Sequence, residues 1–137
     1  MKLQVIYDSN GQKAKSIAET FSCDVQAVKD NPKIWADVIL FICPTYGDEE
    51  LPHNMEDFLL NFNVTIKKNF VVCEIGNYYG YDDFEFGAKN IIQKYLSSLG
   101  WKKFFNGLSL DVIPEIRWKV LNSWKDKLYE KLHTSSS

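Results

Sequence analysis

The sequence predicts an α/β domain in which five parallel strands form one sheet with helices on both faces. Strand and helix patterns alternate along the whole chain, which is typical of this class. The run Val38–Cys43 is apolar without interruption, as expected for a parallel strand that is buried on both faces. Apolar residues with three- and four-residue spacing separate the strand runs, and this spacing predicts amphipathic helices.

The first half of the chain predicts two strands before the central one. Leu3–Tyr7 is a β-prone run, and Asp24–Val28 is the second strand. Between them lies an apolar stripe at helical spacing, made of Ala14, Ile17, Ala18 and Phe21. Asn31-Pro32 interrupts the chain, and a short helical turn through Trp35 is expected after it.

The second half repeats the alternation. The strands are Val38–Cys43, Phe70–Ile75 and Phe105–Leu110. Three helical stripes accompany them: Met55, Phe58, Leu59 and Phe62; then Ala88, Ile91, Ile92, Tyr95, Leu96 and Leu99; and last Val120, Leu121, Trp124, Leu128 and Leu132. Gly100 is the expected C-cap of the second of these helices, and Pro114 precedes the last one.

Length and composition indicate one globular domain. The chain has 137 residues, of which 45% are hydrophobic and 25% charged, so we expect a single domain over 1–133 and a disordered tail over 134–137. A net charge of −2 and a pI of about 5.7 argue against nucleic-acid binding. No apolar run reaches membrane-spanning length. The chain opens directly into a strand pattern, so neither a membrane partner nor a signal peptide is expected.

The cysteines and histidines suggest no metal or disulfide site. Cys23, Cys43 and Cys73 are widely spaced and odd in number, which fits neither a disulfide framework nor a zinc site. Cys43 and Cys73 lie in apolar runs and are expected to be buried thiols. A reducing, cytoplasmic compartment follows as an expectation. His53 and His133 are far apart in the sequence.

Three loops follow the strands whose carboxyl ends would bind a ligand in such a sheet. The first, 8–16, is small and polar and leads into a helix, whose N-terminus suits a phosphate. Ser9 and Asn10 would add side-chain donors there, and Lys13 a charge. A plain N-cap turn with a solvated lysine explains this loop equally well.

The other two loops are rich in tyrosine, glycine and acidic residues. Tyr46 stands beside Gly47 after the third strand, and Tyr78, Tyr79 and Tyr81 follow the fourth. Two aromatic rings on separate loops can sandwich a planar ligand, at about 1–3 kcal/mol per stacking contact. The alternative for Tyr46 is that it covers the edge of the core.

Four short motifs lie in and around these loops: Thr45-Tyr46-Gly47-Asp48 with Asn54, Asp57 and Phe58; Gly76-Asn77 with Gly80-Tyr81 and Phe84; Gly87-Ala88; and the segment 107–111. In these motifs the chain resembles the flavodoxins and the flavodoxin domains of diflavin reductases. The resemblance covers nearly the whole chain. It implies a three-layer α/β/α sandwich with strand order 2-1-3-4-5, in the short-chain form because no insertion of roughly twenty residues splits the last strand.

The resemblance further implies a bound flavin mononucleotide (FMN) and an electron carrier rather than an enzyme, cycling between semiquinone and hydroquinone at low potential. Tyr46 would stack on one face of the flavin ring and Tyr81 on the other, although Tyr78 or Tyr79 is an alternative to Tyr81. Gly47 would turn its carbonyl toward flavin N5. The implied cofactor-binding residues are Ser9, Asn10, Gly11, Gln12, Lys13, Ala14, Pro44, Thr45, Tyr46, Gly47, Asp48, Gly76, Asn77, Tyr78, Tyr81 and Phe84.

The phosphate loop departs from the family pattern Ser/Thr-x-Thr-Gly-x-Thr. Here the corresponding residues are 9–14, Ser-Asn-Gly-Gln-Lys-Ala, so the glycine is one place early and both threonines are missing. Backbone N–H groups with Ser9, Asn10, Lys13 or Ser16 would then hold the phosphate, or FMN would bind weakly.

Acidic residues in the two tyrosine-containing loops predict a redox partner with a basic surface. The acidic rim consists of Asp48, Glu49, Glu50, Asp82, Asp83 and Glu85. It would penalise an anionic reduced flavin and steer a basic patch of a flavodoxin/ferredoxin reductase or an acceptor enzyme. The protein itself is expected to be a monomer.

Two other functions are compatible with the same sequence. One is a flavodoxin-like activator of a ribonucleotide reductase, and the other is a flavin-free interaction module, which the altered phosphate loop favours. A phosphoacceptor receiver domain is excluded, because Asp8 stands alone after the first strand and the third strand ends in Cys43-Pro44.

Overall fold

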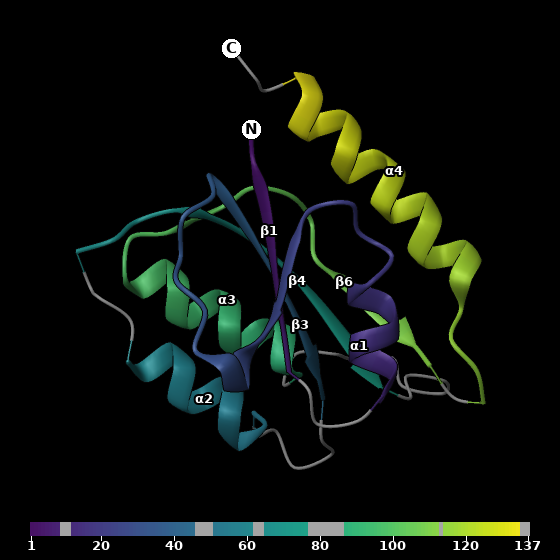
Figure 1. The fold of residues 1–137 in the computed structure, drawn as a ribbon, viewed down its shortest axis with the longest axis horizontal. Coiled ribbons are helices and arrows are strands. Elements are labelled where there is room, and N and C mark those ends of the chain that lie inside the picture. The colour runs from purple at the N-terminus through teal and green to yellow at the C-terminus, as the bar shows by residue number, and fades with distance from the viewer. Residues whose placement is uncertain (9–11, 46–50, 62–64, 77–86, 113, 135–137) are drawn as a thin grey trace.

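The strand runs form one parallel sheet in the order β2-β1-β3-β4-β5 (Figure 1). The computed structural model describes residues 1–8, 12–45, 51–61, 65–76, 87–112 and 114–134. The strands are β1 Leu3–Tyr7, β2 Asp24–Ala27, β3 Val38–Pro44, β4 Asn69–Gly76, β5 Lys102–Lys103 and β6 Leu108–Asp111. The predicted strand order is therefore confirmed, and the second strand ends one residue earlier than expected.

The fifth strand differs from its prediction over Phe105–Leu110. It consists of two pieces that both pair with β4, β5 at Asn69 and Phe70 and β6 from Cys73 onward. Four residues, 104–107, separate these pieces, whereas only two residues of β4, 71–72, lie opposite them. The two extra residues leave the ladder, as in a bulge. This interruption is far shorter than the insertion that the short-chain expectation excluded.

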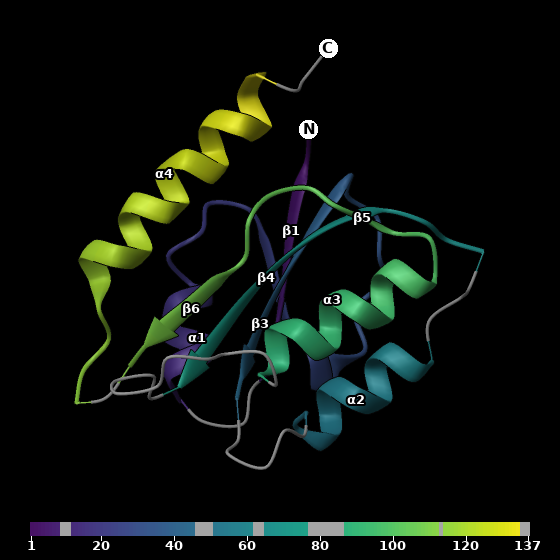
Figure 2. The same cartoon turned by 180° about the vertical axis from the view of Figure 1, so that it is seen from behind.

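Helices cover both faces of the sheet, so the three-layer arrangement is confirmed (Figures 1 and 2). They are α1 Gln12–Ala18, α2 His53–Leu60, α3 Ala88–Ser98 and α4 Trp118–Thr134. Helices α1 and α4 lie on one face, and α2 and α3 on the other. Helix α4 includes Thr134, the first residue of the expected tail, while 135–137 and Phe62 lie outside the described residues.

The helical turn expected through Trp35 is wrong. Residues 32–35 have no regular structure, and a single 3-10 turn, η1 Val28–Asp30, precedes them. Asn31 ends this turn in the left-handed conformation, with φ 50°. Asparagine tolerates this conformation better than most residues, so the break falls at Asn31 and no further turn forms before β3.

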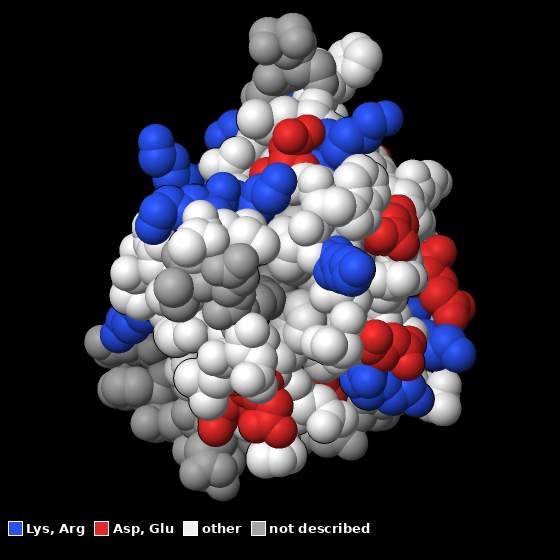
Figure 3. All heavy atoms as spheres, turned by 60° about the vertical axis from the view of Figure 1, so that its left-hand side comes forward, with Lys and Arg blue, Asp and Glu red and all other residues white. Residues whose placement is uncertain are grey.

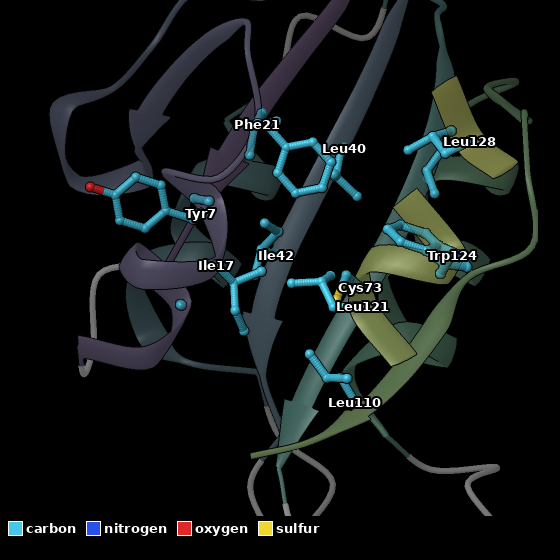
Figure 4. Packing of buried hydrophobic residues seen from close by; sticks show 14 of the residues in the cluster. Tyr7, Ile17, Phe21, Leu40, Ile42, Cys73, Leu110, Leu121, Trp124 and Leu128 are labelled. Carbon is cyan, nitrogen blue, oxygen red and sulfur yellow. The ribbon is translucent and has the colours of Figure 1, made fainter. Parts of the chain in front are cut away.

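Each face of the sheet has its own core. On the α1/α4 face, residues of both helices pack against β1, β3, β4 and β6, as Figure 4 shows for Ile17, Leu121 and Trp124. On the α2/α3 face, Phe41 and Phe70 are fully buried among α2 and α3 residues. Val120, expected in the α4 stripe, is 45% exposed, because a helix turns about 100° between it and the buried Leu121.

Gly100 confirms the predicted end of α3. Its φ is +91°, a left-handed conformation that glycine adopts without steric cost. The Trp101 N–H donates to the Leu96 carbonyl at 3.0 Å, and the Gly100 N–H to the Ser97 carbonyl at 3.0 Å. These bonds satisfy carbonyls of the last helical turn.

Candidate functional site

The strands β1, β3, β4 and β6 end at one edge of the sheet (Figure 2). Parallel pairing brings Tyr7 opposite Ile42, Pro44 opposite Ile75, and Gly76 opposite Asp111. The three loops singled out in the sequence all leave from this carboxyl edge. It is the edge at which parallel α/β sheets bind ligands.

Six of the predicted cofactor-binding residues lie in the described part of the chain. They are Gln12, Lys13, Ala14, Pro44, Thr45 and Gly76. The remaining ones lie outside the described residues: Ser9, Asn10, Gly11, Tyr46, Gly47, Asp48, Asn77, Tyr78, Tyr81 and Phe84. The same holds for the whole acidic rim. Their contacts with a flavin therefore stay predictions.

Helix α1 begins at Gln12, directly after the expected phosphate loop. The Ser16 hydroxyl donates to the Gln12 carbonyl at 3.0 Å, and the Ala14 side chain is buried in the core. The Lys13 Nζ donates to the Val112 carbonyl at 2.6 Å, just beyond β6. Of these side chains, Lys13 ties α1 to the end of β6, and Ser16 bonds within its own helix.

Thr45 connects β3 to β4 and α3. Its N–H donates to the Ile75 carbonyl at 2.8 Å. Its hydroxyl donates to Oε1 of Glu74 at 2.9 Å and accepts the N–H of Ala88 at 3.1 Å. Thr45 thus fixes the end of β3 just before the first tyrosine loop.

Glu74 is a site residue that the sequence analysis missed. Its side chain is fully buried, and besides Thr45 it accepts hydrogen bonds from the Lys89 N–H at 3.0 Å and from the Ser109 hydroxyl. The signal was present in the sequence, since Glu74 is the one charged residue in the otherwise apolar run Phe70–Ile75. A buried carboxylate requires such partners.

A row of polar side chains lies along the carboxyl edge of the sheet, on the face that α2 and α3 cover. The Asp8 N–H donates to the Ile42 carbonyl at 2.9 Å. In the register of the sheet, Cys43 of β3 lies opposite Glu74 of β4, and Glu74 lies opposite Ser109 of β6. Asp8 and Glu74 are both buried. Burial raises the pKa of the Cys43 thiol well above its usual range, and the carboxylates of Asp8 and Glu74 add to the effect. The thiol therefore stays neutral between two acids.

The three cysteines should differ in reactivity. Burial first and Asp24 second raise the pKa of Cys23 from 9.0 to about 11, which lowers its thiolate fraction about a hundredfold at pH 8. The higher intrinsic nucleophilicity that accompanies a higher pKa recovers roughly tenfold, so we expect alkylation about tenfold slower than in the unfolded chain. Iodoacetamide kinetics from pH 7 to 11 should show this rate rising throughout.

Cys43 and Cys73 serve as the internal comparison for Cys23. Both are fully buried, and burial raises the pKa of Cys73 to about 12. They should react only after unfolding. Equal alkylation rates for all three thiols in the folded protein would contradict the deeper burial of Cys43 and Cys73.

The described residues contain no cluster of three side chains suited to a metal ion. Among the described helices, none has the length and apolar character needed to cross a bilayer. A groove of about 800 Å³ lies at the opposite, amino end of β1, lined among others by Met1, Trp35 and Tyr129. It is separate from the carboxyl edge to which the three loops belong.

Comparison with known proteins identifies the architecture. No protein-family model and no curated protein sequence matches the chain. Solved structures do match: oxidised flavodoxin 1 from Bacillus cereus has a TM-score of 0.73 at 18% identity and covers 99% of this chain and 100% of its own.

The chain has the flavodoxin fold.

Two further flavodoxins support this fold assignment. A Fusobacterium nucleatum flavodoxin bound to FMN has a TM-score of 0.73 at 14% identity, and covers 95% of this chain and 98% of its own. A short-chain flavodoxin associated with a PDU bacterial microcompartment has a TM-score of 0.71 at 14% identity. It covers all of both chains, which agrees with the short-chain form.

Proposed function

We propose that this chain binds one FMN at the carboxyl edge and carries electrons with it. The observation that carries the proposal is the position of Thr45 and Gly76. On a flavodoxin fold, they stand at the ends of β3 and β4, directly before the two tyrosine loops. When bound, FMN supplies the redox chemistry, while the protein positions it and sets its electrostatic surroundings.

The donors around this edge suit the two parts of FMN. Tyr46 and Tyr81 supply flat apolar surfaces for the flavin ring, and backbone groups of Thr45–Asp48 and Gly76–Tyr81 supply polar contacts. The Ser16 hydroxyl donates within α1, whereas the Lys13 ammonium donates one hydrogen bond to the Val112 carbonyl and has two further N–H groups. We assign the phosphate to Ser9, Asn10, Lys13 and the backbone N–H groups at the start of α1.

An absorbance spectrum of the purified protein, before and after addition of FMN, tests the proposal. Flavin bands that survive gel filtration, and stepwise one-electron reduction, are expected. A protein that retains no flavin in excess FMN would overturn the proposal. It would favour a flavin-free interaction module, which the altered phosphate loop already supports, with the tyrosine loops as its binding surface.

Neutralising the acidic rim should raise the potential of the second one-electron reduction of bound FMN. Each negative charge about 10 Å from the ring penalises an anionic reduced flavin by roughly 1–2 kcal/mol at an effective dielectric near 20, and salt screening reduces this. The variant replaces Asp48, Asp82 and Asp83 with asparagine and Glu49, Glu50 and Glu85 with glutamine. Redox titration at low and high salt measures the shift.

A second variant, which removes three acids instead of six, controls for the loss of charge alone when the shifts are compared per charge removed. Asp126, Glu130 and Glu19 are exposed acids on α4 and just after α1, and their amide variants should leave the potential nearly unchanged. An equal shift per charge removed in the two variants would show that the rim has no special position near the flavin.

The rim also defines the proposed partner. A reductase or acceptor with a basic patch would be steered to it, and its association rate should fall steeply with ionic strength. The face in Figure 3 carries both signs of charge. Lysines elsewhere are partly engaged in packing, such as Lys131, whose Nζ lies 4.9 Å from the centre of the Phe104 ring.

A further inference from the structure

The buried carboxylate of Glu74 lies where two strands and a helix meet, between the described ends of both tyrosine loops. One loop leaves from Thr45, at the end of β3. The other leaves from Gly76 and returns to the chain at Gly87, just before α3. Glu74 contacts groups at both places.

We infer that Glu74 is a positioning residue of the proposed flavin site. Its carboxylate connects the start of the first tyrosine loop, after β3, to the end of the second tyrosine loop, before α3. This inference rests on the proposed function. Oε1 accepts from the Thr45 hydroxyl at 2.9 Å and from the Lys89 N–H at 3.0 Å, and Oε2 accepts from the Ser109 hydroxyl. The three donors come from the residue directly after β3, from α3 and from β6.

Thr45 completes the connection. Its hydroxyl donates to Glu74 and at the same time accepts from the Ala88 N–H at 3.1 Å. Two free N–H groups of the first turn of α3 are therefore satisfied, one by Thr45 and one by Glu74. A negative charge at a helix N-terminus also interacts favourably with the helix dipole. The first turn of α3 is thus held against the end of β3 through one carboxylate.

Gly87 shows that the carboxylate and the loop end fit closely. A Cβ at this position would overlap Oε1 of Glu74 and come within 3.1 Å of its Cδ. The glutamate cannot move aside without losing its three donors, because it is fully buried. The Glu74 carboxylate therefore leaves room only for glycine at position 87.

Two substitutions separate the effect of the Glu74 negative charge from the effect of its hydrogen bonds. Glu74→Gln keeps an oxygen that accepts from Thr45 and Lys89, and its amide can donate to the Ser109 hydroxyl, which also accepts. It removes the charge but keeps the connection. Glu74→Ala removes both and leaves the Lys89 N–H without its acceptor.

The first experiment measures FMN affinity and potential for the two variants. Glu74→Ala should weaken FMN binding by about tenfold, which corresponds to about 1.4 kcal/mol. Glu74→Gln should restore most of that affinity, yet raise the potential of the second one-electron reduction because a buried negative charge is gone. Glu130→Gln, an exposed change on α4, should alter neither quantity.

The second experiment needs no flavin. Glu74→Ala and Gly87→Ala are each expected to destabilise the apoprotein in urea unfolding, and the double variant should lose less than the sum of the two. Such coupling is expected only between groups in contact. If Glu74→Ala cannot be folded, Glu74→Thr, which also lacks the Cδ and Oε1 atoms that a Cβ at Gly87 would meet, takes its place in the cycle with Gly87→Ala.

The outcomes distinguish the two proposals. A parent protein that binds no FMN overturns the proposed function, and the flavin role of Glu74 with it, whatever the unfolding data show. A parent that binds FMN, with Glu74→Ala binding equally well, overturns the positioning role alone. Additive destabilisation by the Glu74 and Gly87 changes would likewise refute the close fit on which the inference stands.

Discussion

Replacement of Phe41 by alanine is expected to lower the free energy of unfolding of the apoprotein by about 3–5 kcal/mol. Phe41 lies in the middle of β3 and is fully buried between the sheet and the α2/α3 layer. Its ring centre lies 6.4 Å from that of Trp101, with an interplanar angle of 50°. Truncation removes this contact and leaves a cavity that the surrounding strands cannot collapse to fill.

Urea unfolding of the apoprotein measures this loss, with Leu60→Ala as the matched control. Leu60 ends α2 on the same side of the sheet, yet it is 61% exposed. Its replacement should change the stability by no more than about 0.5 kcal/mol. Similar losses for the two variants would mean that Phe41 does not occupy the core described here.

Replacement of Tyr46 or Tyr81 by alanine is expected to have the largest effect on FMN binding. Loss of one stacking contact costs about 1–3 kcal/mol, which is about a 5- to 150-fold increase in the dissociation constant. Titration of the apoprotein with FMN, followed by flavin fluorescence, measures the constant. The double variant should be close to additive, since the two rings would contact opposite faces of the flavin.

Two further variants show whether the effect is specific. Tyr78→Ala tests the alternative stacking residue in the second ring loop. Tyr129→Phe serves as the control, because its hydroxyl accepts the Ser22 N–H at 3.2 Å, away from the carboxyl edge. Unchanged affinity in both Tyr46→Ala and Tyr81→Ala would rule out the sandwich of the flavin between them.

The sheet was predictable because burial on both faces leaves a strong pattern in the sequence. Val38–Cys43 and, apart from Glu74, Phe70–Ile75 are apolar runs with too little amphipathic character for a surface helix, and both are strands of the core. The helix stripe before Gly100 was equally clear, since its end is marked by a residue with positive φ. Such signals depend on local periodicity, which the sequence contains directly.

The last strand was harder to predict, for a reason that is not local. Whether residues 104–107 stay in the ladder depends on how many residues of β4 lie opposite them, and this count is fixed by pairing across the sheet. Phe105 reads as a strand residue by propensity alone. Its segment leaves the sheet, and pairing resumes at Leu108.

The sequence was sufficient to predict which loops form the candidate site, but only some of the residues in it. Parallel topology brings the ends of β1, β3 and β4 together, so the edge followed from the strand order. Lys13 is a predicted phosphate ligand from its charge and position, and the hydrogen bond from its Nζ to the distant Val112 carbonyl is a contact that no spacing in the sequence reveals. Glu74 stands out in the sequence as a charged residue within a buried strand, but its partners come from three distant segments and no spacing in the sequence reveals them.

Met1 and the last turn of α4 lie close together, at the end of the sheet opposite to the proposed flavin site. The amino group of Met1 donates to the Leu132 carbonyl at 3.2 Å, and Figure 1 shows the start of β1 and the end of α4 at the same end of the molecule. An affinity tag, a fluorescent reporter or a surface tether attached next to Met1 or to the end of α4 would therefore leave the carboxyl edge open. A short linker from the end of α4 to the start of β1 would allow circular permutation, since the hydrogen bond between Met1 and Leu132 already holds these two elements together.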